Sequence, residues 1–247
     1  MESYMNRISN TGIVPVVKIL EKEDAYPLAK ALLNGGIDVI EVTYRSEHAT
    51  SAIQTISEQL PDMLVGAGTV LSVEQAKEAV EAGAKFIITP GFNTKVVQWC
   101  LDHDVEVYPG VSTASEVEMA LSMGLTQLKF FPAESSGGAK KLKDLSAPYA
   151  NVHFMPTGGI NTKNMHDYLS LPNVEAIGGS FMLPNDLVVA KDWDGIEALS
   201  RSAIKSLLDF QLIHVGINTN SPEESKQVTD TLCSLFHFTQ YTKPKSN

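Results

Sequence analysis

Short apolar runs alternate with amphipathic segments along most of the chain. The segment 72–84, SVEQAKEAVEAGA, carries its apolar residues three and four positions apart, a spacing that predicts a helix. The same spacing predicts helices over 24–36 and 113–124. Strands are predicted where short, mostly apolar stretches stand between these segments, namely at 12–19, 39–44, 64–70, 86–90, 105–111, 127–132, 153–158 and 176–180.

The strict alternation of strands and helices predicts the fold class. Such alternation requires parallel strands joined by crossover helices. We therefore predict an α/β fold, a (β/α)8 TIM barrel over residues 1–209, with a doubly wound open sheet as the alternative. Residues 210–247 are predicted to form a separate C-terminal βα extension.

Polar and glycine residues recur at the carboxyl ends of the predicted strands, where barrels place their active sites. In chain order these residues are Glu41, Arg45, Thr69, Pro90, Pro109, Gly110, Lys129, Phe131, Thr157, Gly158, Gly159, Gly178, Gly179 and Ser180. The recurrence around the ring, rather than any single residue, indicates a functional site.

Lys129 is the one charged residue in the apolar run QLKFFP (127–132). Three structural explanations compete: the side chain faces solvent, pairs with a buried carboxylate, or extends to the strand end. The chemical explanation is that a lysine deprived of water loses its proton more easily, and a neutral amine attacks carbonyl carbons. Glu41, in the apolar strand VIEVT, is either an ion-pair partner of Arg45 or Lys129, or an acid/base group.

The other candidates also leave two interpretations open. PTGGI (156–160) and IGGS (177–180) favour a phosphate site built from backbone N–H groups over simple tight turns, with hydroxyl donors on Thr157 and Ser180. Arg45 is either a clamp for carboxylate or phosphate, or an ordinary solvated arginine. Thr69 either donates to a substrate carboxylate or only packs, and Lys18 is either an anion contact or a strand-end charge.

Composition narrows the classes of partner. The formal charge of −10 argues against nucleic acid or an anionic membrane as the partner. Cys100 and Cys233 lie far apart and the histidines have no ligand spacing, so we predict no metal site and reduced cysteines. The first residues contain no apolar signal region and no apolar run is long enough to span a membrane, so we expect a cytoplasmic protein.

With these residues identified, the chain resembles a known family. The motifs VPVV, EVTYR, GAGTV, TPG, PGVST, LKFFPAE, PTGGI and GGS are similar, in this order, to those of the 2-keto-3-deoxy-6-phosphogluconate (KDPG) and 4-hydroxy-2-oxoglutarate (KHG) aldolases. The resemblance covers residues 10–209 and implies a cofactor-free class I aldolase, usually a homotrimer, on a (β/α)8 barrel. Its substrate would be a phosphorylated 2-keto-3-deoxy sugar acid, cleaved to pyruvate and glyceraldehyde 3-phosphate.

The resemblance also implies roles for individual residues. Lys129 matches the Schiff-base lysine and Glu41 the catalytic carboxylate. The positions that match the pyruvate end or line the site are Arg45, Thr69, Pro90 and Phe131; those that match the phosphate end are Thr157, Gly158, Gly159, Gly179 and Ser180. Lys18 stands where many relatives carry arginine, and this departure favours the phosphorylated substrate over a dicarboxylate.

Two other functions are consistent with the same strand ends. A phosphate-binding barrel with isomerase or thiazole-type synthase chemistry would have no need of Lys129. A non-catalytic sugar-phosphate sensor would be stabilised by its ligand without turnover.

The C-terminal extension lies beyond the usual end of the family. LIHVGINT (212–219) predicts a strand, and the segment that begins SPEES predicts a helix with Ser221 as N-cap and Pro222 at its first position. The pair is similar to the opening of a glyoxalase-like module, in which His214 would match a metal ligand. Because the remaining strands of such a module are missing, we expect no metal there.

We predict that the extension packs on its own barrel or pairs with another subunit, because an unpaired apolar strand is an association surface. Deleting residues 211–247 should therefore lower the oligomer mass or the melting temperature. Light scattering and thermal denaturation of the two chains measure both, and unchanged values would contradict the prediction.

Overall fold

The computed structural model describes residues 4–208 and 221–236. The chain divides into two compact units, Met1–Asp209 and Phe210–Asn247. The first unit contains the strands and helices that place the candidate site. In the second, the described residues form helix α11 (Pro222–Phe236). Each unit is described by itself.

Among the described residues, every strand pairing is parallel. The strands form a six-stranded sheet in the order β5-β4-β3-β2-β1-β9 and a three-stranded sheet in the order β6-β7-β8. Their bounds are β1 Ile13–Val17, β2 Val39–Thr43, β3 Leu64–Gly68, β4 Phe86–Ile88, β5 Glu106–Tyr108, β6 Gly110–Val111, β7 Gln127–Phe130, β8 His153–Pro156 and β9 Ile177–Gly179. A bridge between Thr157 and Gly178 joins the ends of β8 and β9.

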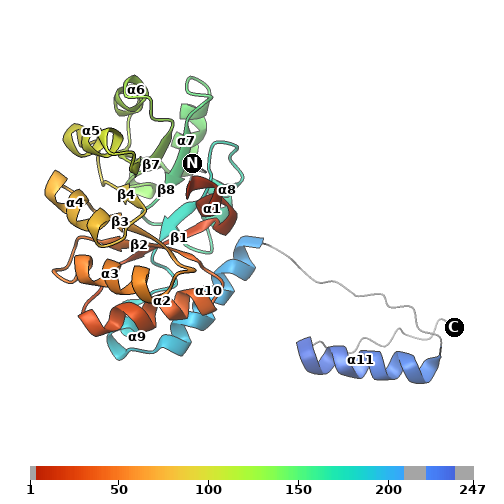
Figure 1. The fold of residues 1–247 in the computed structure, drawn as a ribbon. Helices are drawn as coiled ribbons and strands as arrows, with labels where there is room; N and C mark the ends of the chain where they lie inside the picture. Colours follow the sequence, from red (N-terminus) through yellow and green to blue (C-terminus); the bar gives the residue numbers. More distant parts are fainter. Residues whose placement is uncertain (1–3, 209–220, 237–247) are drawn as a thin grey trace. The chain divides into compact units, whose positions relative to one another are not determined.

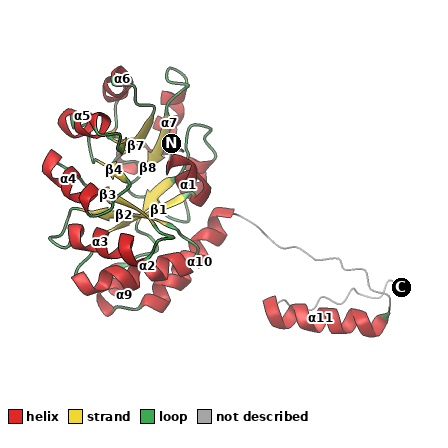
Figure 2. Ribbon diagram, in the orientation of Figure 1, coloured by secondary structure: helices red, strands yellow, loops and turns green. Residues whose placement is uncertain are grey.

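Except between β5 and β6, helices connect successive strands, and most of them lie around the outside of the sheets (Figures 1 and 2). Their bounds in the first unit are α1 Tyr4–Thr11, α2 Ala25–Asn34, α3 Ala49–Gln59, α4 Val73–Glu81, α5 Thr94–Asp102, α6 Ala114–Ser122, α7 Gly138–Ser146, α8 Met165–Leu169, α9 Asn185–Ala190 and α10 Trp193–Leu208. Side-chain caps fix several starts. Thr113 and Glu116 form a capping box on α6, and the Ser72 hydroxyl accepts from the Gln75 N–H on α4.

The α/β class with parallel strands is confirmed, as are the three helices predicted from spacing. The single strand predicted over 105–111 is wrong, because it is broken into β5 and β6 at Pro109. Proline has no N–H to donate to a ladder. The pairing of β5 with β4 ends at Tyr108, and the pairing of β6 with β7 begins at Gly110, so the strand changes partner at this proline. The closure of both sheets into one complete barrel stays a prediction.

The inner, concave side of the strands carries its own apolar cluster. Strands of both sheets and helix α1 contribute to it, through Met5, Ile8, Val14, Val39, Leu64, Phe86, Ile88, Tyr108, Met155 and Ala176. A second, larger cluster fills the layer between the strands and the outer helices. Burial on both faces is what nearly continuous apolar strands require.

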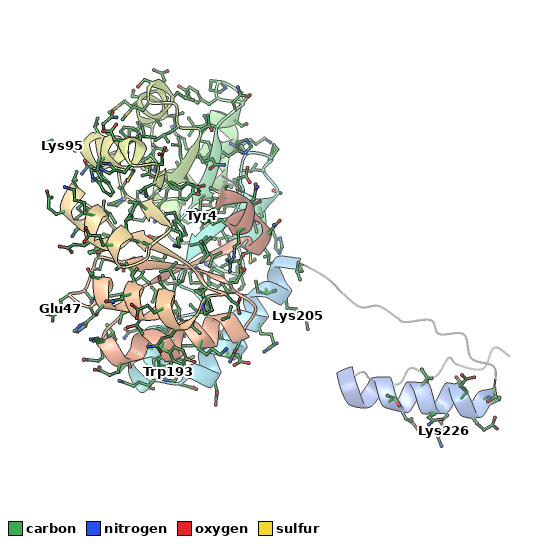
Figure 3. The ribbon with its side chains drawn as sticks, viewed as in Figure 1. Tyr4, Glu47, Lys95, Trp193, Lys205 and Lys226 are labelled. Atoms are coloured by element: carbon green, nitrogen blue, oxygen red, sulfur yellow. The ribbon has the colours of Figure 1, made fainter. Side chains whose placement is uncertain are left out.

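Helix α1, which the sequence analysis did not predict, covers the amino ends of the strands. Arg7 Nε donates to Asp38 Oδ2 at 2.9 Å, and the Tyr4 N–H donates to Glu106 Oε1 at 2.9 Å. Figure 3 shows Tyr4 close to the strands, whereas Glu47 and Lys95 lie at the outer rim. With α1 over the amino ends, the site candidates lie at the opposite, carboxyl ends.

The inner face becomes more polar toward the carboxyl ends of the strands. On β2 the alternate residues run from Val39 to Glu41 to Thr43, and all three are buried. On β7, Lys129 follows Gln127 on the same face. The apolar cluster therefore lies directly beneath the charged pair.

In the second unit, α11 starts as the sequence predicts. The Ser221 hydroxyl accepts from the Glu224 N–H at 3.1 Å, which confirms the N-cap. The predicted strand and His214 lie outside the described residues. No helix within residues 4–208 or 221–236 combines the length and apolar character needed to cross a membrane.

We predict that replacing Ile8 with alanine lowers the free energy of unfolding by about 2–4 kcal/mol, because the fully buried side chain of α1 fills the inner cluster. Asn6→Ala, an exposed position on the same helix, is the control and should change it by less than about 0.5 kcal/mol. Urea unfolding of both variants measures the difference. Equal effects would show that α1 does not close the inner cluster.

Candidate active site

A buried ion pair occupies the inner face of the strands. Lys129 Nζ on β7 lies 3.1 Å from both Glu41 Oε1 and Glu41 Oε2 on β2. The two side chains are only 5% and 1% exposed. Of the interpretations left open for these residues, solvent exposure of Lys129 is excluded and the pairing of Glu41 is with Lys129. Each charge offsets the desolvation of the other, which is the condition for burying either.

Glycines on the neighbouring strand make room for this pair. A Cβ atom at Gly68, the last residue of β3, would lie 1.9 Å from Glu41 Oε1. At Gly66, a Cβ would lie 2.0 Å from the ring of Phe86. The two glycines of GAG in the GAGTV motif are therefore required by packing: Gly68 leaves space for the Glu41 carboxylate, and Gly66 leaves space for the Phe86 ring.

Backbone hydrogen bonds join the loop after β7 to the loop after β8. The Ala133 N–H donates to the Thr157 carbonyl at 2.8 Å, and the Glu134 N–H donates to the Gly158 carbonyl at 3.1 Å. Phe131, at the start of the first loop, has its ring centroid 5.4 Å from Lys129 Nζ. The nucleophile candidate and the TGG loop are thus parts of one connected unit.

Glu134 and Tyr168 support the TGG loop from the side. Gly159 has a φ of 81°, and a Cβ there would lie 2.6 Å from Glu134 Cγ. The Tyr168 hydroxyl of α8 donates to Glu134 Oε1. Burial, and then the Glu134 carboxylate, raise the pKa of Tyr168 well above its usual value, so the phenol stays a donor at neutral pH.

Free donors remain in the TGG loop. Within residues 4–208, the N–H groups of Gly158 and Gly159 donate no backbone hydrogen bond. The Thr157 hydroxyl is buried and has no hydrogen-bond partner among the described residues. A Cβ at Gly178 would lie 2.2 Å from that hydroxyl, so this glycine leaves room for it. Unpartnered donors at a strand end suit an anionic ligand.

Two basic side chains, Lys18 and Arg45, lie just after the carboxyl ends of β1 and β2. A cavity of about 200 Å³ is lined by Lys18, Arg45 and Ser180, together with Asn185 and with apolar residues of β1, α2, α9 and the loops after β1 and before α9. It brings together Arg45, assigned to the pyruvate end, and Ser180, assigned to the phosphate end. Lys18 and Arg45 place two positive charges at this cavity in a chain of net charge −10.

Three further candidates have unusual backbone conformations or close packing. Thr69 has a φ of 54°, a conformation that costs a β-branched residue about 1–3 kcal/mol and that clusters at functional sites. The Pro90 carbonyl would lie 2.3 Å from a Cβ at Gly110, which pairs with Lys129 in the register of β6 and β7. Pro90 therefore borders the strand next to Lys129. At Gly179, a Cβ would lie 2.9 Å from the ring of Phe181.

Several residues that hold this arrangement were not identified from the sequence. Gly68 was read only as part of a motif, and Thr43, Glu134 and Tyr168 were not singled out. Its position two residues before a strand-end arginine was the only local signal for Thr43. Nothing local links Glu134 to Tyr168, because they are far apart in the chain and meet only through α8.

Several known proteins are similar to this chain. A family model described as KDPG and KHG aldolase matches residues 4–199. The 2-dehydro-3-deoxy-phosphogluconate aldolase of Treponema pallidum is 44% identical over 205 residues, which cover 83% of this chain and 98% of that protein. The KHG/KDPG aldolase of Escherichia coli is 44% identical over 199 residues, which cover 80% of this chain and 93% of that protein.

A solved structure with a covalent ligand is also similar. It is the KDPG aldolase of Legionella pneumophila with pyruvate captured at low pH as a covalent carbinolamine intermediate. It is 39% identical, with a TM-score of 0.79, and the match covers 82% of this chain and 99% of that one.

We predict that Gly68→Ala displaces the Glu41 carboxylate, because the added Cβ would overlap it. The expected loss is about 1–3 kcal/mol in the free energy of unfolding, measured with urea. Gly91→Ala is the matched control, since nothing lies within 4 Å of a Cβ there. Equal stability of the two variants would mean that Gly68 does not make room for the carboxylate.

Proposed function

Because this chain belongs to the KDPG and KHG aldolase family, we propose that it is a class I aldolase. Its substrate is 2-dehydro-3-deoxy-6-phosphogluconate, which it cleaves to pyruvate and glyceraldehyde 3-phosphate. The same chemistry extends to 4-hydroxy-2-oxoglutarate, with glyoxylate as the second product. The single observation that carries the proposal is the buried Lys129 amine, 3.1 Å from both oxygens of Glu41.

The reaction begins with the transfer of the Lys129 proton to Glu41. The free amine attacks the C2 ketone, a C–N bond forms, and the carbonyl oxygen takes up a proton to give a carbinolamine. Loss of water from the carbinolamine leaves a protonated imine. The carboxylate supports both proton movements because its two oxygens face Nζ equally.

The imine then acts as the electron acceptor for cleavage. Glu41, through a water molecule, removes the C4 hydroxyl proton, the C3–C4 bond breaks, and its electrons move toward the imine nitrogen. The aldehyde departs and an enamine remains on Lys129. Glu41 returns a proton to C3, and hydrolysis of the imine releases pyruvate and regenerates the lysine. Every step uses groups of this chain and water.

The remaining candidates hold the two ends of the substrate. We assign the keto-acid end to Arg45, Thr69, Pro90 and Phe131. The phosphate end is assigned to residues of the two glycine loops, Thr157, Gly158, Gly159, Gly179 and Ser180. The free N–H groups of the TGG loop support the phosphate end. The cavity shared by Lys18, Arg45 and Ser180 supports anion binding beside residues of both ends.

Three broader features are part of the proposal. Residues 1–209 form a closed (β/α)8 barrel; the bridge between β8 and β9 and the inner cluster shared by both sheets support closure. Residues 210–247 are an extension outside the catalytic unit. The active form is a homotrimer, as the family resemblance implies, and we expect it in the cytoplasm.

The isomerase, synthase and sensor alternatives are less well supported. None of them needs a buried lysine paired with a carboxylate, and the curated relatives at 42–44% identity carry aldolase names.

Cleavage kinetics of two variants test the proposal. Lys129→Met should abolish pyruvate release from 2-dehydro-3-deoxy-6-phosphogluconate, because no amine remains to form the imine. Glu41→Gln should lower kcat by about 10²- to 10⁴-fold, the usual contribution of general acid–base catalysis. Lys140→Met, at an exposed lysine, is the control and should keep full activity.

Each single variant leaves one buried charge unpaired, which costs about 3–5 kcal/mol. The double variant Lys129→Met/Glu41→Gln removes both charges, so it should regain stability in thermal denaturation and stay inactive. A folded, active Lys129→Met protein would instead favour the isomerase or synthase alternative. Ligand-dependent stabilisation of a wild-type protein without turnover would favour the sensor.

A further inference from the structure

Arg45 has no carboxylate partner among the described ion pairs. The side chain is exposed and lines the cavity that also contains Lys18 and Ser180. A free guanidinium on a long, flexible stem adopts many orientations, and an anion that binds it must restrict them. Anything in the protein that restricts the guanidinium beforehand therefore improves binding.

One contact restricts it. Arg45 Nε donates to the hydroxyl oxygen of Thr43 at 3.2 Å. Thr43 is fully buried at the end of β2, on the same face as Glu41 and one alternate position further toward the carboxyl end. The anchor of Arg45 is thus a rigid part of the strand that also carries the Glu41 carboxylate.

The direction of this contact is fixed by a second hydrogen bond. The Thr43 hydroxyl donates its only hydrogen to the Val17 carbonyl at the end of β1, at 2.8 Å. A lone pair of the same oxygen is then left for Arg45 Nε. Val17 directly precedes Lys18, so the hydroxyl ties the strand ends that carry both cations of the cavity.

We propose that Thr43 is a positioning residue that orients Arg45 for a carboxylate. With Nε engaged, the two terminal Nη groups of the guanidinium form the free edge, and such an edge binds a carboxylate through two parallel hydrogen bonds. Thr43 itself is buried and touches the substrate only through Arg45. The inference rests on the proposed function, in which Arg45 holds the carboxylate of the keto acid.

Substitutions at Thr43 separate the hydroxyl from the shape of the side chain. Thr43→Val keeps the branched shape and removes the hydroxyl; we expect KM for 2-dehydro-3-deoxy-6-phosphogluconate to rise about tenfold, with kcat within about twofold of wild type. Thr43→Ser keeps the hydroxyl and loses a methyl group, and KM should stay within about threefold. Both are measured as pyruvate release by the full chain.

Thr11→Val is the matched control at the opposite ends of the strands. Thr11 is also buried, and its hydroxyl bonds to Asp38 Oδ1 at 2.5 Å, beside another arginine, Arg7. This variant should lose stability in thermal denaturation while KM stays at the wild-type value. It shows what the loss of a buried threonine hydroxyl does when Arg45 is not involved.

A double-variant cycle supplies a result that a purely structural role would not give. Arg45→Met should raise KM, and adding Thr43→Val to it should raise KM no further, because no guanidinium is left to orient. A wild-type KM for Thr43→Val, equal effects of valine and serine, or multiplying effects in the cycle would each overturn the inference. Absence of cleavage by the wild-type chain would contradict the proposed function itself.

Discussion

The buried contact between Lys129 and Glu41 is the constraint on which the rest of the site depends. Two opposite charges lie 3.1 Å apart in surroundings from which water is almost excluded. Such a pair is stable only as a pair, because removing either partner leaves an uncompensated charge. Chemistry requires the opposite: the proton must leave Nζ so that the amine can attack a carbonyl. A pair in which the carboxylate can take that proton meets both demands.

Residues below, beside and above this pair hold it in place. Below it, apolar residues and α1 close the amino ends and exclude water. Beside it, the absence of a side chain at Gly68 leaves space for the carboxylate. Above it, the loops that carry Phe131 and Gly158 are joined by backbone hydrogen bonds. Precise placement therefore comes from strands and short, fastened loops, which suits a reaction in which one lysine must meet one carbonyl carbon.

Much of this could be predicted from the sequence, because local pattern and chemistry coincide. The spacing of apolar residues predicted the α/β class. A lysine and a glutamate in otherwise apolar strands made a buried ion pair one of the expected explanations. Contacts that depend on three-dimensional proximity left no local signal: the hydroxyl of Thr43 beneath Arg45, the bond from Tyr168 to Glu134, and the role of α1. The break at Pro109 was visible in principle, but the apolar residues on both sides of the proline outweighed it in the strand prediction.

Trapping with pyruvate tests the central claim most directly. The full chain is incubated with pyruvate, reduced with borohydride, digested and mapped by mass spectrometry. A stable adduct with the mass of a reduced pyruvyl group on the peptide that contains Lys129 is the predicted result, since borohydride converts the imine to an amine that hydrolysis cannot reverse. A folded protein that gives no adduct, or that carries the adduct on another lysine, would contradict the account.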